Sequence, residues 1–100
     1  MITKELYINA DSNAREFAYK VKHDAEFKIY KITYSDGTIK YRPYYLDISK
    51  FFGIVWDKSW YGFKKDVYSS YLEFSTPEEV ECFFERLRYY AKVEIKKEEI

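Results

Sequence analysis

The chain has 100 residues, 47% of them hydrophobic and 34% charged, a balance typical of one folded domain over residues 1–100. Its 17 basic and 17 acidic side chains give zero formal charge. This balance argues against a strongly basic nucleic-acid coat protein but leaves room for a local basic patch. No stretch approaches the roughly 20 apolar residues of a membrane span.

The single cysteine excludes an intrachain disulfide framework. Residues 1–5 lack the basic and then apolar pattern of a signal peptide. We therefore expect a cytoplasmic protein, in a reducing compartment, that makes no contact with a membrane. Aromatic residues make up 22% of the chain, and the 12 tyrosines suit partly buried surfaces and interfaces.

The first predicted element is a strand over residues 2–8, because Leu6 and Ile8 alternate around Tyr7. A cluster of helix-capping residues at 11–13 then predicts a helix over about 12–22. The buried stripe of this helix has helical spacing and consists of Ala14, Phe17, Ala18 and Val21. Because Phe17, Tyr19 and Val21 also alternate, a strand is the alternative for this segment.

Residues 26–46 predict a β-hairpin whose two-residue loop is Asp36-Gly37. This loop would gather the large apolar side chains on one side of the ribbon. It would also place Lys31 directly opposite Arg42, which is unfavourable unless an anion relieves the repulsion. Pro43 cannot donate to a ladder and indicates a sheet edge.

The middle of the chain, residues 47–65, has no clear period. Asp47 can cap a short helix over 48–52 that Gly53 ends. Residues 54–65 then form an aromatic and basic loop or an irregular strand.

Residues 66–74 return to a period of two, which predicts a strand with Tyr71 on the face opposite to Phe74. The last helix begins with Thr76 as its N-cap and Pro77 as its first residue. Its buried stripe consists of Val80, Phe83, Phe84, Leu87 and Ala91. Alternation around Val93 and Ile95 predicts a closing strand.

These elements follow the order strand, helix, strand, strand, helix, strand, with a central insertion. This is the order of ferredoxin-like folds, and it predicts an α+β two-layer sandwich with a mainly antiparallel sheet and two helices on one face. Two stretches, 6–9 (LYIN) and 71–80 (YLEFSTPEEV), resemble the RNA-recognition motif family in its first strand and in its third strand leading into a helix. The resemblance implies that Tyr7 and Tyr71 lie on the open sheet face where that family stacks bases.

The chain departs from that family at the start of its third-strand motif, which has Lys or Arg, then Gly, and an aromatic ring at the third position. Here those places hold Val67, Tyr68 and Ser69, so the basic anchor, the glycine and one stacking ring are missing. A second alignment takes 38–46 as the third strand and 47–75 as the insertion. The sequence does not decide between the two.

No residue constellation points to catalysis. One histidine, His23, and one cysteine, Cys82, are too few for a tetrahedral zinc site. Glutamates surround Cys82 in the sequence and would raise the pKa of its thiol. We predict no catalytic residue, no metal and no cofactor. A metal-dependent nuclease is the minor alternative, because residues 26–28 and 94–96 both read Glu-x-Lys.

Two surfaces are candidates for binding. Residues 56–65 interleave aromatic rings with lysines, a combination suited to a protein hot spot or to single-stranded nucleic acid. The predicted partner contacts there are Trp56, Lys58, Trp60, Tyr61, Phe63, Lys64 and Lys65. The polar side of the hairpin and the tyrosines implied by the resemblance give the nucleic-acid candidates Tyr7, Tyr71, Lys31, Lys40, Arg42 and Tyr44.

The sequence therefore favours a small non-enzymatic protein-interaction module, an inhibitor or adaptor that docks another protein through an aromatic and basic surface. The alternative is a single-stranded nucleic-acid (RNA) binding protein that stacks bases on the open sheet face. The two differ in salt response, because phosphate contacts release counterions and apolar docking does not. A homodimer is a further alternative, since an open aromatic sheet face needs a cover.

Overall fold

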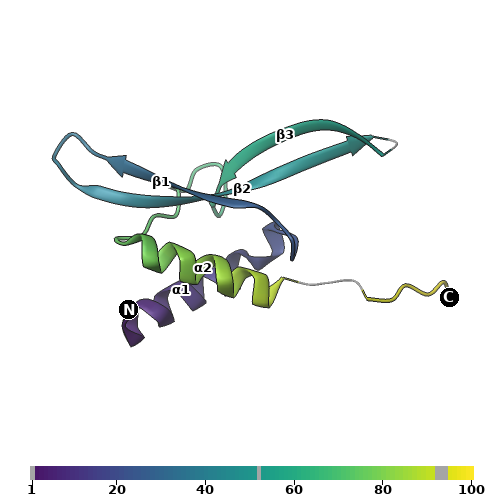
Figure 1. Ribbon diagram of the computed structural model, residues 1–100, viewed down its shortest axis with the longest axis horizontal. Helices are drawn as coiled ribbons and strands as arrows, with labels where there is room; N and C mark the ends of the chain where they lie inside the picture. The colour runs from purple at the N-terminus through teal and green to yellow at the C-terminus, as the bar shows by residue number, and fades with distance from the viewer. Residues whose placement is uncertain (1, 52, 92–94) are drawn as a thin grey trace.

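The computed structural model describes residues 2–51, 53–91 and 95–100, and all of their side chains except those of 48–51, 55 and 56. A three-stranded antiparallel sheet forms one layer, and a pair of helices covers one of its faces (Figure 1). In chain order the elements are α1 (Lys4–Phe17), β1 (Phe27–Thr33), β2 (Ile39–Phe51), β3 (Ile54–Gly62) and α2 (Pro77–Tyr90). The predicted α+β class and two layers are confirmed, whereas the ferredoxin-like order with an insertion is not.

The first element is a helix, so the strand predicted over 2–8 is wrong. The Thr3 hydroxyl caps this helix by accepting a hydrogen bond from the Leu6 amide at 3.2 Å. Its buried side consists of Ala10, Ala14 and Phe17, at helical spacing. The capping residues at 11–13 therefore lie in mid-helix, because burial of this stripe outweighs their preference for helix ends.

The helix predicted over 12–22 is right in type but wrong in both bounds. It begins at Lys4, ends at Phe17 and continues as a 3-10 turn over Ala18–Lys20. The alternative strand over this segment is wrong. Tyr19 is three-quarters exposed, so it does not share the burial of Phe17 that an alternating strand would require.

The predicted hairpin exists between β1 and β2, but its loop has three residues, 35–37, instead of two. The Tyr34 amide donates to the Thr38 carbonyl at 2.8 Å, and Gly37 takes a left-handed φ of +88°. A tight turn closed by a left-handed glycine is the usual three-residue hairpin loop.

The longer loop shifts the strand pairing by one residue from the predicted register. Tyr30 lies opposite Arg42, and Lys31 lies opposite Tyr41. The predicted opposition of Lys31 and Arg42 is therefore wrong, and no anion is needed to relieve it. Because a shift of one residue exchanges the two faces, Lys31 lies on the opposite side of the sheet from Arg42.

β2 is the central strand and changes its partner near Pro43. Before the proline, the Tyr41 amide donates to the carbonyl of Phe74 at 2.8 Å. After it, β3 begins to pair, with Tyr44 opposite Gly62. Pro43 itself has no partner among the described residues on this side of β2, so its missing N–H breaks no hydrogen bond. The predicted sheet edge is therefore only a local gap in the pairing of a central strand.

Two further predictions for the middle of the chain are corrected. Residues 48–51 belong to β2 and not to a short helix, and Gly53, with φ +78°, lies between β2 and β3. The strand predicted over 66–74 is reduced to a bridge at Phe74. Ahead of it the Asp66 carboxylate accepts hydrogen bonds from the Tyr68 and Ser69 amides, which makes a turn.

α2 agrees with the prediction. Thr76 is its N-cap and accepts a hydrogen bond from the Glu79 amide at 3.3 Å, and Pro77 is its first residue. All five predicted stripe residues are buried, among them Phe83 at 0% exposure. The closing strand around Val93 lies mostly outside the described residues, and Ile95 is exposed.

The two helices run side by side in the same direction (Figure 1). The Asp11 carboxylate of α1 accepts hydrogen bonds from Arg86, at 2.7 Å, and from the Tyr90 hydroxyl, at 2.8 Å, both of α2. Tyr90 in turn accepts one from Arg15 at 3.0 Å. This network holds the helical layer together at its solvent side.

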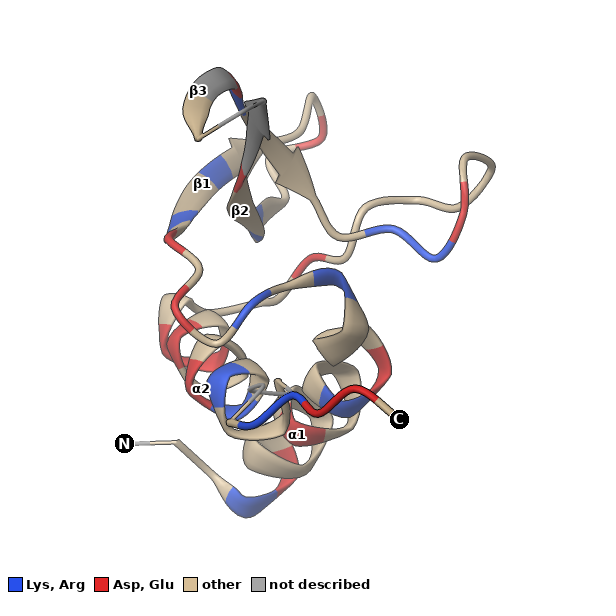
Figure 2. Cartoon of the chain, turned by 90° about the vertical axis from the view of Figure 1, so that its right-hand side faces the viewer, with Lys and Arg blue, Asp and Glu red and all other residues tan. Residues whose placement is uncertain are grey.

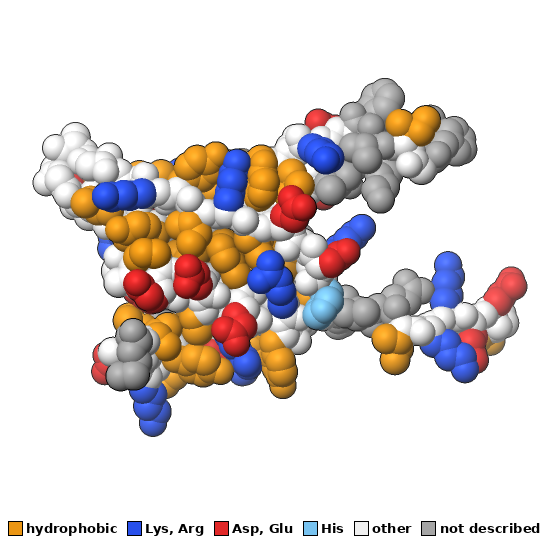
Figure 3. All heavy atoms as spheres, in the orientation of Figure 1, with side chains coloured by type: hydrophobic (Ala, Val, Ile, Leu, Met, Phe, Trp, Pro, Cys, Tyr) orange, Lys and Arg blue, Asp and Glu red, His pale blue; other side chains and the backbone are white. Residues whose placement is uncertain are grey.

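Aromatic rings dominate the core between the layers. Figure 3 shows hydrophobic side chains along the seam between the layers on one face of the molecule. Phe63 and Phe83 are fully buried, with ring centroids 5.0 Å apart. Phe27 of β1 stacks on Phe84 of α2 at 4.4 Å. The core therefore draws its rings from both layers.

Candidate functional site

Side chains of alternate strand residues point away from the helices and form what we call the outer face. Its strand members are Lys28, Tyr30, Ile32, Lys40, Arg42, Tyr44, Leu46, Lys58 and Trp60. Their strand neighbours of the other parity, such as Phe27 and Tyr45, pack against the core. Even-numbered residues of β2 point outward, and the residues of β1 and β3 directly opposite them point to the same face.

Residues 71–74 extend the outer face on the side of β2 away from β1. Leu72 and Phe74 turn inward to the core, while Tyr71 and Glu73 turn outward. The alternation predicted over 66–74 is therefore confined to residues 71–74, since Val67 and Tyr68 are 80% and 95% exposed. Tyr71 lies on the outer face.

Tyr71 lies over Gly62 of β3. A β-carbon at position 62 would approach the Tyr71 ring to 2.5 Å, so only glycine leaves room for the ring. The guanidinium of Arg42 lies 4.6 Å from the ring centroid, and the Lys64 ammonium lies 4.9 Å from it. Tyr71 is nevertheless 42% exposed.

Glu73 is the anchor of this arrangement. Its carboxylate accepts hydrogen bonds from Arg42 at 3.0 and 3.2 Å and from the Tyr34 hydroxyl at 2.5 Å. Burial acts to lower the pKa of the Arg42 guanidinium, but its hydrogen bonds to Tyr44 and Glu73 outweigh burial and raise this pKa above the ordinary arginine value. The hydrogen bond to Glu73 likewise raises the pKa of the Tyr34 hydroxyl.

A second aromatic and cationic group lies across β1 and β3. The Lys28 ammonium lies 4.1 Å from the ring centroid of Trp60 and 4.9 Å from that of Tyr30. Tyr30 meets Tyr44 edge to face at 4.9 Å, which links this group to the Arg42 side of the face.

The outer face is basic. Along the three strands and residues 71–74 it carries the cations Lys28, Lys40, Arg42 and Lys58 against the single carboxylate Glu73. None of these three lysines, nor Lys64, forms an ion pair among the residues that the structure describes. Figure 2 shows basic segments along β1 and several acidic segments around the two helices. The outer face is thus locally basic within a chain of zero net charge.

The structure joins parts of the two predicted sites into one surface. Lys58, Trp60 and Lys64 come from the predicted partner-binding segment, while four residues come from the nucleic-acid set: Lys40, Arg42, Tyr44 and Tyr71. The side chain of Trp56 lies outside the described residues. Residues 54–62 form strand β3, so the segment is no exposed loop.

Several predicted site residues do not lie on this surface. Tyr61 and Phe63 turn inward, where Phe63 is fully buried and packs on Phe83 and Tyr45. Lys65 pairs with Glu16 of α1 at 3.0 Å. Lys31 has the inner parity of its strand, and Tyr7 lies on α1, with its ring 5.7 Å from the Arg86 guanidinium.

Sequence reasoning missed Lys28, Tyr30, Gly62 and Glu73 as members of this surface. The parity of β1 and β2 would have found the first two, had the loop been counted as three residues. The contacts of Gly62 and Glu73 join segments far apart in the chain, and nothing in the local sequence indicates them.

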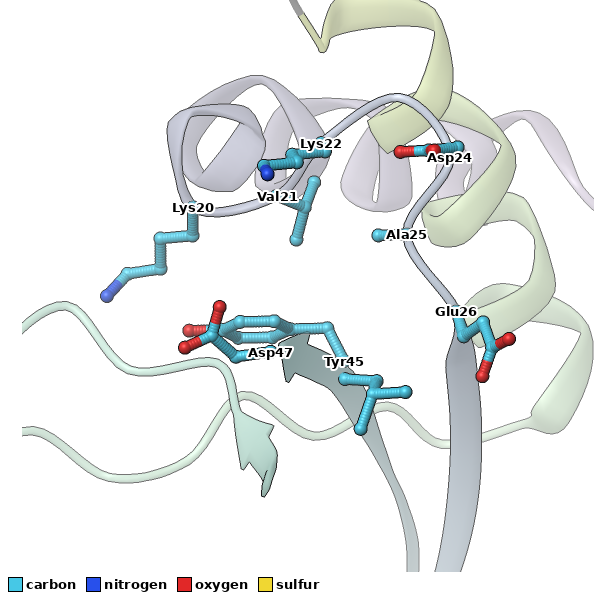
Figure 4. Close-up of a pocket in the computed structure, with 9 residues that line it drawn as sticks. Lys20, Val21, Lys22, Asp24, Ala25, Glu26, Tyr45 and Asp47 are labelled. Atoms are coloured by element: carbon cyan, nitrogen blue, oxygen red, sulfur yellow. The ribbon is translucent and has the colours of Figure 1, made fainter. Parts of the chain in front are cut away.

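A cleft of about 530 Å³ lies between residues 20–26 and residues 45–47 in the middle of β2 (Figure 4). Val21 and Ala25 line one wall, and Tyr45 and Asp47 line the other. Burial raises the pKa of the Tyr45 hydroxyl, and the nearby Asp47 carboxylate adds to this. Leu46 also lines this cleft, and it is the one named strand member of the outer face that does so.

The surroundings of Cys82 and Asp11 bear on the enzymatic alternatives. Burial, together with the Glu85 carboxylate, raises the pKa of the Cys82 thiol, which disfavours the thiolate. Asp11, which precedes the Glu-x-Lys stretch at 26–28, accepts hydrogen bonds from Arg86 and Tyr90. Among the described residues there is no group of three or more His, Cys, Asp or Glu side chains that could hold a metal ion.

Comparison with protein-family models, curated proteins and solved structures finds no match to this chain. Within the described part of the chain, neither helix has the length and apolar character needed to cross a membrane. The function must therefore be argued from the outer face itself.

Proposed function

We propose that the chain is a small non-enzymatic binding protein and that its outer face binds single-stranded nucleic acid. The observation that carries this proposal is the convergence, on one sheet face, of exposed rings and of lysines that form no ion pair with any described residue. Proteins that bind single strands combine aromatic platforms for the bases with cations for the phosphates. Single-stranded nucleic-acid binding, the alternative in the sequence analysis, thereby becomes our leading proposal.

The cations that now lie on the rings support this mode of binding. An exposed cation–π contact contributes only about 0.5–1 kcal/mol, so Lys28 can leave Trp60 for a phosphate at small cost. A base stacked on an aromatic ring contributes about 1–3 kcal/mol in return. Duplexes offer no such exchange, because their bases are already stacked.

The test is a titration with short single-stranded oligonucleotides, poly-uridine RNA and poly-thymidine DNA, at two salt concentrations. Tryptophan fluorescence reports binding because Trp60, one of the two tryptophans, is 36% exposed on this face. If Lys28, Lys40, Lys58 and Lys64 each neutralise a phosphate, the slope of log K against log salt should be about −3. A salt-independent affinity would contradict the proposal.

Two matched pairs of variants locate the site. Lys58→Gln should reduce the salt slope by about 0.7, whereas Lys65→Gln, whose lysine pairs with Glu16, should leave it unchanged. Tyr71→Ala should weaken binding about tenfold, the loss of one stacked base, whereas Tyr19→Ala, an exposed tyrosine after α1, should not. Equal effects within either pair would place binding elsewhere.

A protein partner is the second candidate, in which the chain acts as an inhibitor or adaptor. It is favoured by the presence of Trp60, Tyr71 and Arg42 on one face, since Trp, Tyr and Arg are the commonest hot-spot residues. The basic outer face would then meet an acidic partner. Failure of both oligonucleotides to bind at low salt would reject the first candidate and leave this one.

A further inference from the structure

The outward edge of β1 carries backbone groups that no described residue uses. The sheet order is β1, β2, β3, so β1 pairs on one side only. The Leu46 amide donates to the Glu26 carbonyl, and the Tyr34 amide donates to the Thr38 carbonyl. These two bonds show which residues of β1 face β2 with their backbone groups. Even-numbered residues of β1 therefore bond to β2, and odd-numbered residues direct their N–H and C=O groups outward.

Four residues make up this outward row: Phe27, Ile29, Lys31 and Thr33. The row ends at Ala25, whose carbonyl accepts a hydrogen bond from Arg88 of α2 at 3.4 Å. An edge of this length without a bulge is a template for another strand unless something blocks it.

We propose that β1 pairs antiparallel with β1 of a second copy of this chain, about a two-fold axis at Tyr30, to form a continuous six-stranded sheet. In this register each outward residue meets an outward residue, Phe27 with Thr33 and Ile29 with Lys31, in both directions. The four pairs form about eight hydrogen bonds between the copies.

The side chains favour this register over its neighbours. Lys31 meets Ile29 and Lys28 meets Ile32 of the other copy, so no lysines are opposed. A shift that centres the axis on Lys31 would oppose the two copies of Lys31. A shift that centres it on Ile29 would bring Thr33 opposite Ala25, whose carbonyl is already occupied.

Tyr30 supplies the apolar contact at the axis. Its side chain is 45% exposed on the outer face. The two copies of Tyr30 would be directly opposed as a non-hydrogen-bonded pair, the arrangement in which side chains approach most closely. An aromatic pair of this kind stabilises cross-strand pairing.

Sedimentation equilibrium of the full chain over a wide concentration range tests the association. Lys31→Pro removes an outward N–H in each copy and leaves the β1–β2 ladder intact, because Lys31 does not bond to β2. It should weaken dimerisation about tenfold or more, through the loss of two hydrogen bonds. Lys31→Gln, which keeps the N–H, should leave dimerisation unchanged.

A cysteine crosslink tests the register. In a Cys82→Ser background, Tyr30→Cys should form an intermolecular disulfide under mild oxidation, because the two Cα atoms would lie at bonding separation. Ile32→Cys should not, since its own counterpart would lie about 13 Å further along the other strand. A chain that stays monomeric at all concentrations, or one that crosslinks equally at both positions, would overturn the proposal. Neither readout involves nucleic acid, so its failure would leave the proposed function untouched.

Discussion

The two faces of the sheet use the same kinds of residue for opposite purposes. On the inner face rings pack against rings, as where Phe27 stacks on Phe84 at 4.4 Å. On the outer face rings pack against cations, as where Lys28 lies 4.1 Å from the Trp60 ring centroid. Neighbouring residues of one strand supply both arrangements. Burial between layers requires apolar partners, whereas an open face keeps its cations in water and its rings available.

This contrast predicts very different costs for removing a ring. Phe83→Ala should lower the free energy of unfolding by about 3–5 kcal/mol, because the fully buried ring contacts Phe63, Phe74 and Phe84. Trp60→Ala on the outer face should lower the melting temperature by no more than a few degrees. Urea unfolding followed by circular dichroism measures both. Equal losses would mean that the outer face is a second core.

Gly62→Ala sharpens the contrast within the outer face. The new methyl group would meet the Tyr71 ring at 2.5 Å and should displace it, at a cost of about 1–3 kcal/mol in unfolding free energy. The double variant Gly62→Ala with Tyr71→Ala should be no less stable than Gly62→Ala alone, because the clash is gone. Additive losses in a double-mutant cycle would show that the glycine serves another purpose.

The smallest effect is expected at the solvent side of the helical layer, where pH is the probe. Hydrogen bonds from Tyr90 and Arg86 hold the pKa of the Asp11 carboxyl below its ordinary value. A depressed pKa stabilises the fold above the ordinary range of an aspartate, and this contribution is lost as the pH falls through the folded-state value. Asp11→Asn should therefore have a lower melting temperature than the parent chain at neutral pH, and the decrease should be smaller than that caused by Phe83→Ala.

Melting curves recorded from neutral to acid pH supply the check on Asp11. The gap between the parent chain and Asp11→Asn should narrow as the parent carboxyl becomes protonated. A gap that is the same at every pH would show that the carboxylate charge does not hold α1 to α2.

The last helix could be read from the sequence because its signals are local. Thr76 and Pro77 set its start, and the helical spacing from Val80 to Leu87 defines its buried side. The hairpin was also visible, but its register was not. A left-handed Gly37 fits both a two-residue and a three-residue loop, and the choice between them moves every side chain of one strand to the other face.

The first helix shows why local signals can mislead. Alternation at 6–8 and capping residues at 11–13 both predicted a boundary between a strand and a helix, whereas one helix spans Lys4–Phe17. Asp11 serves as an acceptor for Arg86 and Tyr90, which lie far away in the sequence. A contact of that kind can hold a weak helix former in mid-helix.

The sequence by itself determined the class of the protein, one α+β domain with an aromatic core, and the ends of α2, because composition and helix capping act over a few residues. Only the tertiary structure decided which rings and lysines share a face. Strand parity, the glycine beneath Tyr71 and the carboxylate that holds Arg42 arise from segments that meet only in the fold. The candidate site is therefore a product of long-range packing, built from residue types that the sequence had already made conspicuous.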